Sequence, residues 1–485
     1  MSLYNNAIWS FMNTIGVQII VLITNVVLAR LLYPEIFGVL GMATVITGLI
    51  LLFQEQGLST YLIFKTNVDE KIIYTTFWLN IIISFLLAGI TFLTAPLIAE
   101  FYNNNDVGTI VKYISIGMLC GSFGITSRIL LVKQQNFKKL TIIECFAEVV
   151  NCIVSITLAL NNQPLLAIAS RLVIRPMIQS FLLLIVNRDK VIGKPQFNIM
   201  SEAVVYGIKI LGSQILIYCN NNITYLIIGK ILGNKSLGLY TVAFQWSVIA
   251  RYYISSAIVK VAFPEISKIK DDISRVRHLY NNVTNKLSFI TLPICLGLMA
   301  VTPEFVLVFY GSSWEKVVPI LQLLLISGAV TSFGTVGGAI FNGLGRPEVD
   351  MKINIGSLIS GIVFICLGSF YGIVGVTLGI VINSLIFETV KIIFVNKMID
   401  NRFKDFIRTI GLNLMPSLLM VSVIYLIRVE VLVNMPNYSL KLIVLVLIGS
   451  FTYIVFSFFI NKENFDWIYK KITNNVKKQI AVKES

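Results

Sequence analysis

The sequence predicts an all-α integral membrane protein with about fourteen transmembrane helices, arranged as two pseudo-twofold-related six-helix lobes followed by two C-terminal helices. Three observations support this fold class: the apolar composition, fourteen separate apolar stretches, and basic residues that gather on alternate connections. Of the 485 residues, 56% are hydrophobic and 13% are charged, whereas a soluble domain has about 25% charged residues. The mean hydropathy is +0.82. This composition excludes a soluble enzyme, a disordered chain and a secreted disulfide scaffold.

Each apolar stretch is long enough to cross a bilayer, for which a helix needs about 20 residues. No charged residue precedes Arg30, so we expect the first stretch to stay in the membrane as a span rather than act as a signal peptide. Connections at 33–35, 161–164 and 370–372 are turn-sized, which makes neighbouring helices antiparallel. The fourteen predicted spans are 8–31, 36–63, 73–97, 108–131, 140–160, 164–186, 203–229, 236–263, 285–309, 317–343, 352–370, 372–396, 407–427 and 440–460.

Basic residues are distributed unequally between the two sides of the predicted membrane. Of the 39 Lys and Arg residues, 25 lie on the side of the N-terminus, 7 lie on the opposite side and 7 lie within spans. Because cytoplasmic connections retain Lys and Arg, this asymmetry predicts a multi-pass membrane protein with both termini in the cytoplasm. The net charge of +15 is thereby explained without a nucleic-acid partner, and we expect none.

The connections and the reactive side chains argue against catalysis. No outer connection exceeds about a dozen residues, which is too short to fold into a catalytic domain. The lone His278 lies in a polar loop, and the six cysteines lie in apolar stretches at spacings that match no metal pattern. We therefore expect a protein that is not an enzyme and that holds no metal or cofactor, with coupling to H⁺ or Na⁺ left open.

The sequence contains an internal repeat. Residues 28–39 recur at 228–239 with basic residues and glycines aligned, and Ser122-Phe123-Gly124 recurs as Ser332-Phe333-Gly334, so that the offset grows from 200 to 210. The repeat unit contains six spans, and this even number gives both halves the same orientation, related by an axis along the membrane normal. The predicted organisation is a first lobe at 1–186, a cytoplasmic linker at 187–202, a second lobe at 203–396, and the last two spans with a basic tail at 397–485.

An ordered series of short motifs resembles a known family. Trp9-Ser10 and the run Leu-Ala-Arg-Leu-Leu-Tyr-Pro-Glu-Ile-Phe-Gly at 28–38 are followed by matching segments at 77–80, 95–102 and 137–140. Over residues 5–400 the chain resembles Wzx/WzxC-like polysaccharide flippases of the MOP superfamily, which also contains the MATE exporters. One departure is the segment 222–225, Asn-Ile-Thr-Tyr, where relatives often have an acidic residue, and this departure leaves ion coupling open.

The resemblance implies an exporter that flips polyprenyl-diphosphate-linked oligosaccharide from the cytoplasmic to the outer leaflet. The glycan would serve O-antigen, capsule, exopolysaccharide or teichuronic-type polymers, and the partners would be membrane lipids, a glycan polymerase and chain-length machinery. Two alternatives share the fold, a multidrug antiporter and a flippase for the peptidoglycan lipid precursor. The first is disfavoured because span 8–31 has no acidic residue. A membrane glycan polymerase or ligase is disfavoured by the short outer connections.

Charges within the spans are the first candidate site residues, because a charge at bilayer depth is costly and usually faces a cavity or a partner. Arg171 and Arg175 are four residues apart and share one helix face, as do Glu144 and Glu148 of the preceding span. One interpretation is a structural Glu–Arg pairing between the two spans. The other is that the arginines bind the diphosphate while the glutamates hold them or take part in proton coupling.

Two further cations lie in the second half of the sequence. Arg251 lies about 22 Å from the outer end of its span at 1.5 Å per residue, which is close to the midplane. We expect it to face the cavity as an anion site and to meet Glu55 when one gate closes. Lys209 lies near the cytoplasmic end of its span, where it either meets the diphosphate or snorkels to the lipid head groups.

The remaining candidates are amides and charges near the cytoplasmic ends of the spans. Asn25 and Asn221 lie in repeat-related spans, 8–31 and 203–229, and either bind sugar or hold helices together. Arg128 and Lys391 are expected to snorkel, although Lys391 could pair with Glu388 three residues before it.

Overall fold

The structure is a computed structural model that describes residues 3–64, 69–197, 201–433, 435–462 and 464. Within this part of the chain some helical residues are described by their backbone alone. They are 3–8, 55–61, 63–64, 201–210, 212–213, 216, 220, 252–254 and 256–263.

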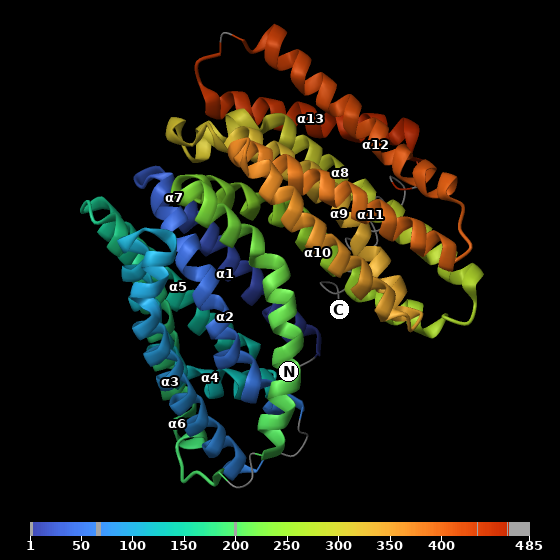
Figure 1. The fold of residues 1–485 in the computed structure, drawn as a ribbon. Coiled ribbons are helices and arrows are strands. Elements are labelled where there is room, and N and C mark those ends of the chain that lie inside the picture. Colours follow the sequence, from blue (N-terminus) through green and yellow to red (C-terminus); the bar gives the residue numbers. More distant parts are fainter. Residues whose placement is uncertain (1–2, 65–68, 198–200, 434, 463, 465–485) are drawn as a thin grey trace, which may run out of the picture. The chain divides into compact units, whose positions relative to one another are not determined.

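All regular secondary structure in the described residues is helical, as the sequence predicts (Figure 1). In the described part of the chain, twelve helices are long and apolar enough to cross a membrane. A helix can do so because its backbone polar groups are satisfied internally. The two other predicted spans fall on the long helix α7. The helices are α1 (Leu3–Leu31), α2 (Pro34–Phe64), α3 (Glu70–Tyr102), α4 (Asn105–Lys133), α5 (Phe137–Leu160), α6 (Pro164–Val191), α7 (Ser201–Lys268), α8 (Ile273–Phe309), α9 (Val317–Gly343), α10 (Pro347–Ser369), α11 (Gly372–Met398), α12 (Phe403–Leu426) and α13 (Tyr438–Ile460), with short turns η2 (Ser312–Trp314) and η3 (Ile427–Val431).

Tight turns join the helices where the sequence predicts them. Asn162 has a φ of 57° and Pro164 is the first residue of α6, which suits proline because a first-turn N–H has no partner within the helix. Gly372 has a φ of 71° and opens α11. These short connections confirm that α5 with α6, and α10 with α11, are neighbours along the chain with no intervening domain.

Helix α7 consists of two helical segments. Gly233 between them has a φ of 78° and a ψ of −179°, a conformation that is essentially restricted to glycine. The segments 201–232 and 234–268 contain the predicted spans 203–229 and 236–263, so the sequence and the structure agree on where the chain bends.

By its internal contacts the chain divides into two compact units, Met1–Leu239 and Tyr240–Ser485. The division falls after the first segment of α7, whereas the predicted linker lies at 187–202. The first segment stays with unit 1 because it packs on α2. The Tyr218 hydroxyl donates to the carbonyl of Val45 at 2.8 Å, and Gly48 leaves room for the Tyr218 ring.

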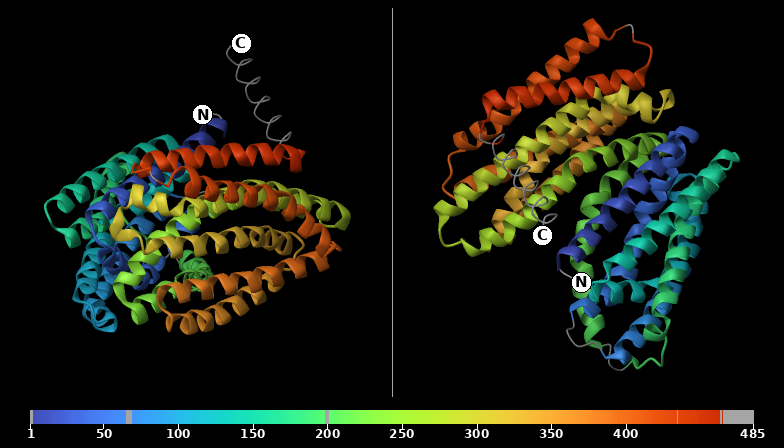
Figure 2. Two further views of the ribbon diagram at one scale, coloured as in Figure 1. Left: turned by 90° about the horizontal axis from the view of Figure 1, so that it is seen from above. Right: turned by 180° about the vertical axis from the view of Figure 1, so that it is seen from behind.

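The helices of each unit lie side by side in both views of Figure 2, and in each unit we call the helix with the most buried apolar window the central helix. In unit 1, α4 contacts α2, α3, α5 and α6, and in unit 2, α9 contacts α8, α10 and α11. The most apolar window of both α4 and α9 is 61% buried, more than that of any other candidate span in the described residues. Helices α4 and α9 carry the repeated Ser-Phe-Gly motif, so the two repeat copies occupy the same place in their units.

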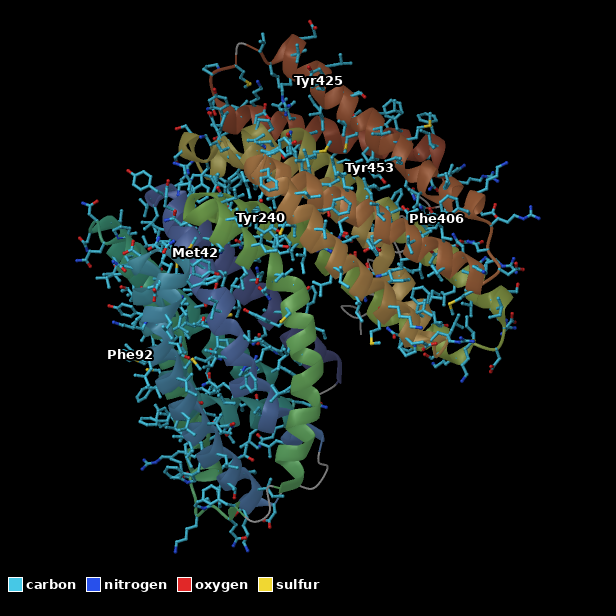
Figure 3. All side chains as sticks on the ribbon, in the orientation of Figure 1. Met42, Phe92, Tyr240, Phe406, Tyr425 and Tyr453 are labelled. Carbon is cyan, nitrogen blue, oxygen red and sulfur yellow. The ribbon has the colours of Figure 1, made fainter. Side chains whose placement is uncertain are left out.

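The outer surface of each unit carries apolar side chains, as a lipid-facing surface requires. Figure 3 shows Phe92 projecting outward from α3, and it is 49% exposed, whereas Met42 lies among the helices of unit 1 and is 1% exposed. Helices α12 and α13 pack on α8 and on each other. Asn413 donates to Ser288 at 2.7 Å and Tyr453 donates to the carbonyl of Phe289 at 2.6 Å, so polar bonds fix both helices to unit 2.

A charged cluster on α4, α5 and α6

Helix α5 buries two carboxylates on one face. Asn136 caps the helix by accepting from the backbone N–H of Lys139, and the carboxylates follow two and three turns later at Glu144 and Glu148. Glu144 is 5% exposed and Glu148 is 1% exposed. A buried carboxylate requires charged or hydrogen-bonding partners, and α4 and α6 supply them.

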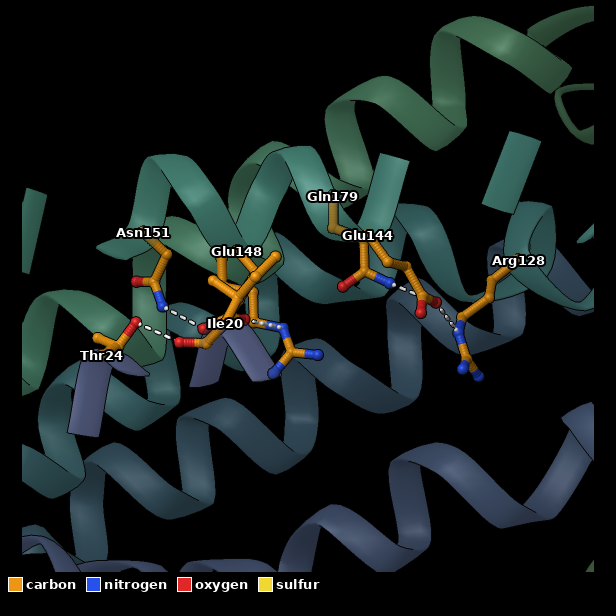
Figure 4. A network of polar contacts seen from close by, with 8 residues as sticks. Ile20, Thr24, Arg128, Glu144, Glu148, Asn151 and Gln179 are labelled. Atoms are coloured by element: carbon orange, nitrogen blue, oxygen red, sulfur yellow. Dashed lines mark hydrogen bonds and ion pairs between the residues drawn. The ribbon is translucent and has the colours of Figure 1, made fainter. Parts of the chain in front are cut away.

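Glu148 forms an ion pair with Arg175 of α6. Its Oε2 atom lies 3.0 Å from Nε of Arg175, and the amide of Asn151 donates to its Oε1 atom at 3.2 Å (Figure 4). The predicted Glu–Arg pairing between the two helices therefore exists in the structure. Asn151 was not among the predicted residues, although it lies one turn after Glu148 on the same helix face.

Glu144 binds two side chains from different helices (Figure 4). Its Oε1 atom accepts from Nε of Arg128 in α4 at 2.8 Å and from the amide of Gln179 in α6 at 3.2 Å. The expectation that Arg128 snorkels is corrected by this ion pair, which the buried carboxylate favours. Gln179 lies one turn after Arg175, so the same four-residue spacing could have found it.

Arg171 lies one turn before Arg175 and binds α1. Its Nη1 atom donates to Oδ1 of Asn25 at 2.6 Å. Asn25, Arg171, Arg175 and Glu148 were predicted separately as site residues, and the structure brings them together between α1, α5 and α6. We refer to these four residues with Arg128, Glu144, Asn151 and Gln179 as the α4–α6 cluster.

The guanidinium groups of the cluster retain free donors. Arg128 and Arg175 are both held through Nε, and no other bond to either side chain is found in the described part of the chain. Each guanidinium carries five N–H donors. The Arg175 side chain is 37% exposed and that of Arg128 is 52% exposed, while their carboxylate partners are buried. The acids thus hold the Nε edge of each guanidinium, while the rest of each side chain stays partly exposed.

The other predicted site residues are not in this cluster. Arg251 lies in unit 2, where its Cδ atom would be 3.2 Å from a Cβ atom at Gly328 of α9. Asn221 is exposed on the first segment of α7. The side chains of Glu55 and Lys209 lie outside the described residues, and so does the expected contact between Glu55 and Arg251.

Unit 2 contains a charged pair that the sequence did not predict. Nζ of Lys391 lies 3.3 Å from Oδ1 of Asp350 and 3.3 Å from Oδ1 of Asn354. Lys391 therefore binds α10, and the expected pairing with Glu388 and the expected snorkelling are both corrected. Glu388, three residues before Lys391, was the wrong partner because the ammonium binds the preceding helix α10 instead of an acid on its own helix.

The two copies of the repeated motif contact each other within unit 1. A Cβ atom at Gly38 would overlap the carbonyl oxygen of Asn234, and one at Gly238 would overlap that of Pro34. Since 34 corresponds to 234 and 38 to 238, the contact is reciprocal, which is the property of a local two-fold axis. Nζ of Lys235 lies 2.9 Å from Oε1 of the equivalent residue Glu35. We call this set of residues the motif contact.

Comparison with known proteins decides the family. A family model described as "Polysaccharide biosynthesis protein" matches residues 27–319, well over half of the chain. The chain belongs to this polysaccharide biosynthesis family. The family match contains both motif copies and every member of the α4–α6 cluster except Asn25.

Members of the family and solved structures with the same fold agree with this assignment. The lipopolysaccharide biosynthesis protein WzxC of Escherichia coli is 26% identical and covers 85% of both chains. The succinoglycan biosynthesis transport protein ExoT of Rhizobium meliloti is 23% identical and covers 71% of this chain and 70% of its own. The lipid II flippase MurJ in an inward closed conformation has a TM-score of 0.72 at 16% identity, covering 95% of this chain and 99% of its own. An inward-facing MATE multidrug transporter has a TM-score of 0.62 at 17% identity, covering 79% and 94%. These structures share the predicted MOP fold.

Proposed function

We propose that this chain is a transporter that flips polyprenyl-diphosphate-linked oligosaccharide repeat units from the cytoplasmic to the outer leaflet by alternating access. The observation that carries the proposal is the α4–α6 cluster, in which Arg128 and Arg175 are each held by a buried carboxylate and keep free guanidinium donors. The family membership supports the same function, since relatives are named for lipopolysaccharide, teichuronic acid and succinoglycan biosynthesis.

The chemistry of the cluster suits a diphosphate. A guanidinium presents its donors in a planar fork that matches phosphate oxygens, and it stays charged at any physiological pH. Arg171 and Arg175 would bind the diphosphate, while Glu144 and Glu148 hold the guanidinium groups in place and give the site its orientation. Arg251 and Lys209 would act as further anion sites along the path, and Glu55 as a gating partner of Arg251.

Amide side chains would meet the sugars. Asn25 accepts from Arg171 through Oδ1, which places this amide beside the guanidinium groups of the α4–α6 cluster. Asn221 is exposed on α7. The relatives are named for different glycans, so the common chemistry of the substrates is the lipid diphosphate rather than a particular sugar.

The proposal includes the location and the partners. The chain would reside in the bacterial cytoplasmic membrane with both termini in the cytoplasm, and would deliver its cargo to a glycan polymerase and chain-length machinery. We propose no enzymatic activity. In the described residues the longest connections on the proposed outer side are 310–316 and 432–437, which are too short to form a separate catalytic domain.

Deletion and complementation test the function. In a strain without the gene, lipid-linked oligosaccharide should accumulate on the cytoplasmic leaflet, and the wild-type chain should restore export. Arg175→Gln should reduce export at least tenfold at equal protein level, because it removes the cation while its amide can still donate to Glu148. Arg188→Gln is the matched control, since Arg188 lies exposed near the end of the same helix. Accumulation of the peptidoglycan precursor instead, or full export by Arg175→Gln, would contradict the proposal.

A further inference from the structure

Helix α11 places a carboxylate against the central helix of unit 2. A Cβ atom at Gly334 of α9 would overlap Oε2 of Glu388, so the glycine is what allows the carboxylate to lie there. Helix α9 carries no ionisable side chain between Val317 and Gly343. Glu388 therefore points its carboxylate at an apolar helix that cannot neutralise it.

The Oε2 atom of Glu388 is buried and has no hydrogen-bond partner among the described residues. An ionised carboxylate oxygen in this position gains no hydrogen bond in exchange for the water it loses. The ammonium of Lys391, one turn further along α11, binds Asp350 and Asn354 of α10 and donates no hydrogen bond to Oε2, so it acts on Glu388 through its charge. A proton bound to the carboxyl group would remove the charge that lacks a hydrogen bond.

The equivalent position in unit 1 shows that packing does not require an acid there. Gly124 of α4 corresponds to Gly334, and a Cβ atom at Gly124 would lie 2.6 Å from Oγ of Ser180 in α6. Ser180 therefore has the place of Glu388, and its number differs by 208, within the range of offsets that relate the repeat copies. The Ser180 hydroxyl donates to the carbonyl of Gly121 at 2.9 Å. The same position is filled by a satisfied hydroxyl in one unit and by an unsatisfied carboxyl in the other.

Among the described side chains, three charged groups act on Glu388 from its own helix and from the surrounding helices. They are Lys391 on its own helix, Asp350 on α10 and Arg251 on the second segment of α7. With Glu388 ionised, these four groups have no net charge, and with Glu388 protonated they carry one positive charge. A proton on Glu388 therefore removes a negative charge from the surroundings of Arg251, which strengthens the attraction of Arg251 for an anion.

We propose that Glu388 is a proton-binding site of unit 2, which takes up and releases one proton in each transport cycle. Its role in the cycle rests on the proposed transport function, but the proton site itself does not. The protonated carboxyl favours anion binding at Arg251, and loss of the proton favours anion release. The ligand is a proton rather than a metal ion because the ammonium of Lys391 already occupies the oxygens of Asp350 and Asn354, which are the nearest additional ligands that α10 could offer.

Infrared difference spectroscopy on the purified full-length protein tests the site directly. Between acidic and alkaline buffer the wild type should show the C=O stretching band of a carboxylic acid that loses its proton, and Glu388→Gln should lose this band. Glu144→Gln is the control, because Glu144 is buried but ion-paired with Arg128, and the band should remain. Glu388→Ser introduces serine, the residue type that unit 1 has at the equivalent position, Ser180. If Glu388→Gln does not fold, the same band is measured in Glu388→Ser. A band that persists in both Glu388 variants would overturn the proposal.

Export measurements separate this proposal from the proposed function. In the complemented deletion strain, wild-type export should fall when the pH gradient is collapsed, whereas export by Glu388→Gln should be low and should not respond to the gradient. Glu388→Asp should retain the response. If the wild-type chain fails to restore export, the proposed function fails while the infrared result still decides the proton site. If Glu388→Gln responds to the gradient as the wild type does, the role in the cycle is refuted.

Discussion

Glu148 is the most deeply buried charge of the α4–α6 cluster, and its burial determines the effect of substitutions around it. Removing one partner of a buried ion pair leaves an unpaired buried charge and destabilises the protein by about 1–3 kcal/mol or more. Removing both partners leaves no unpaired charge, so it costs less than the two single changes together. Arg175→Ala should therefore destabilise the protein more than the double variant with Glu148→Gln does. Thermal unfolding of the four members of this cycle in one detergent measures the coupling.

The second pair of the cluster provides the comparison for this cycle. Arg128 is more exposed than Arg175, and Gln179 also donates to Glu144, so Arg128→Ala leaves the carboxylate with a partner. The loss of stability should be smaller for Arg128→Ala than for Arg175→Ala. Equal losses at both sites would show that the buried pairs are not what stabilises α5 against its neighbours.

At the residue scale, spacing predicts which side chains share a helix face, but it does not predict which helices meet. The pairing of Glu148 with Arg175 could be predicted because both lie on adjacent helices at similar depth. The partners of Arg128 and Lys391 were missed although they also lie on a neighbouring helix along the chain, because spacing within one helix does not show which side chains of two neighbouring helices lie at the same height. The roles of Arg171, Arg251 and Asn221 in binding stay predictions.

At the scale of elements, Gly233 controls the shape of α7. No L-amino acid with a side chain readily adopts its φ of 78° with ψ near 180°, and forcing one to do so costs about 1–3 kcal/mol. Gly233→Ala should lower the thermal stability and reduce export, because the two segments of α7 would need to change direction. Thermal unfolding in detergent and export in the complemented strain are the measurements.

Gly89→Ala is the matched control for this prediction. Gly89 lies within α3 and has no atom within 4 Å of its Cβ position, so alanine there should be neutral or stabilising by up to about 1 kcal/mol. A loss of stability at Gly89 as large as that at Gly233 would show that the effect comes from general helix packing and not from the bend.

The existence of the helices follows from hydropathy, which explains why the predicted spans agree with the helices of the described chain. The membrane requires each crossing to be a run of apolar residues, so the signal is strong even without an alignment. Hydropathy also places a break between the spans 203–229 and 236–263, but it does not reveal the glycine-specific backbone conformation at Gly233. The assignment of the first segment of α7 to unit 1 was missed for a related reason, since it depends on contacts with α2.

At the scale of the whole molecule, the duplication produced two units with the same framework and different chemistry. In each unit the helix that follows the central one contributes an ion-paired acid, Glu144 on α5 and Asp350 on α10. The cation comes from the central helix α4 in unit 1 and from α11 in unit 2. Both units have glycine at the equivalent positions Gly124 and Gly334, where helices approach closely. The charged residues around these positions differ between the units. Unit 1 has guanidinium groups and unit 2 has the carboxyl group of Glu388.

The motif contact leads to a prediction that depends on the reciprocal contact between the two repeat copies. Alanine at Gly38 or at Gly238 would overlap the main chain of the opposite copy, and each substitution must separate the two copies by a similar displacement. Both single variants should therefore reduce export and stability to a similar degree, at a cost of about 1–3 kcal/mol. The double variant should be little worse than either, because one displacement relieves both overlaps. Gly16→Ala, where the added carbon meets only Sγ of Cys145 at 3.4 Å, should leave both unchanged. Unequal single effects, or fully additive effects in the double variant, would mean that the two copies do not act as one contact.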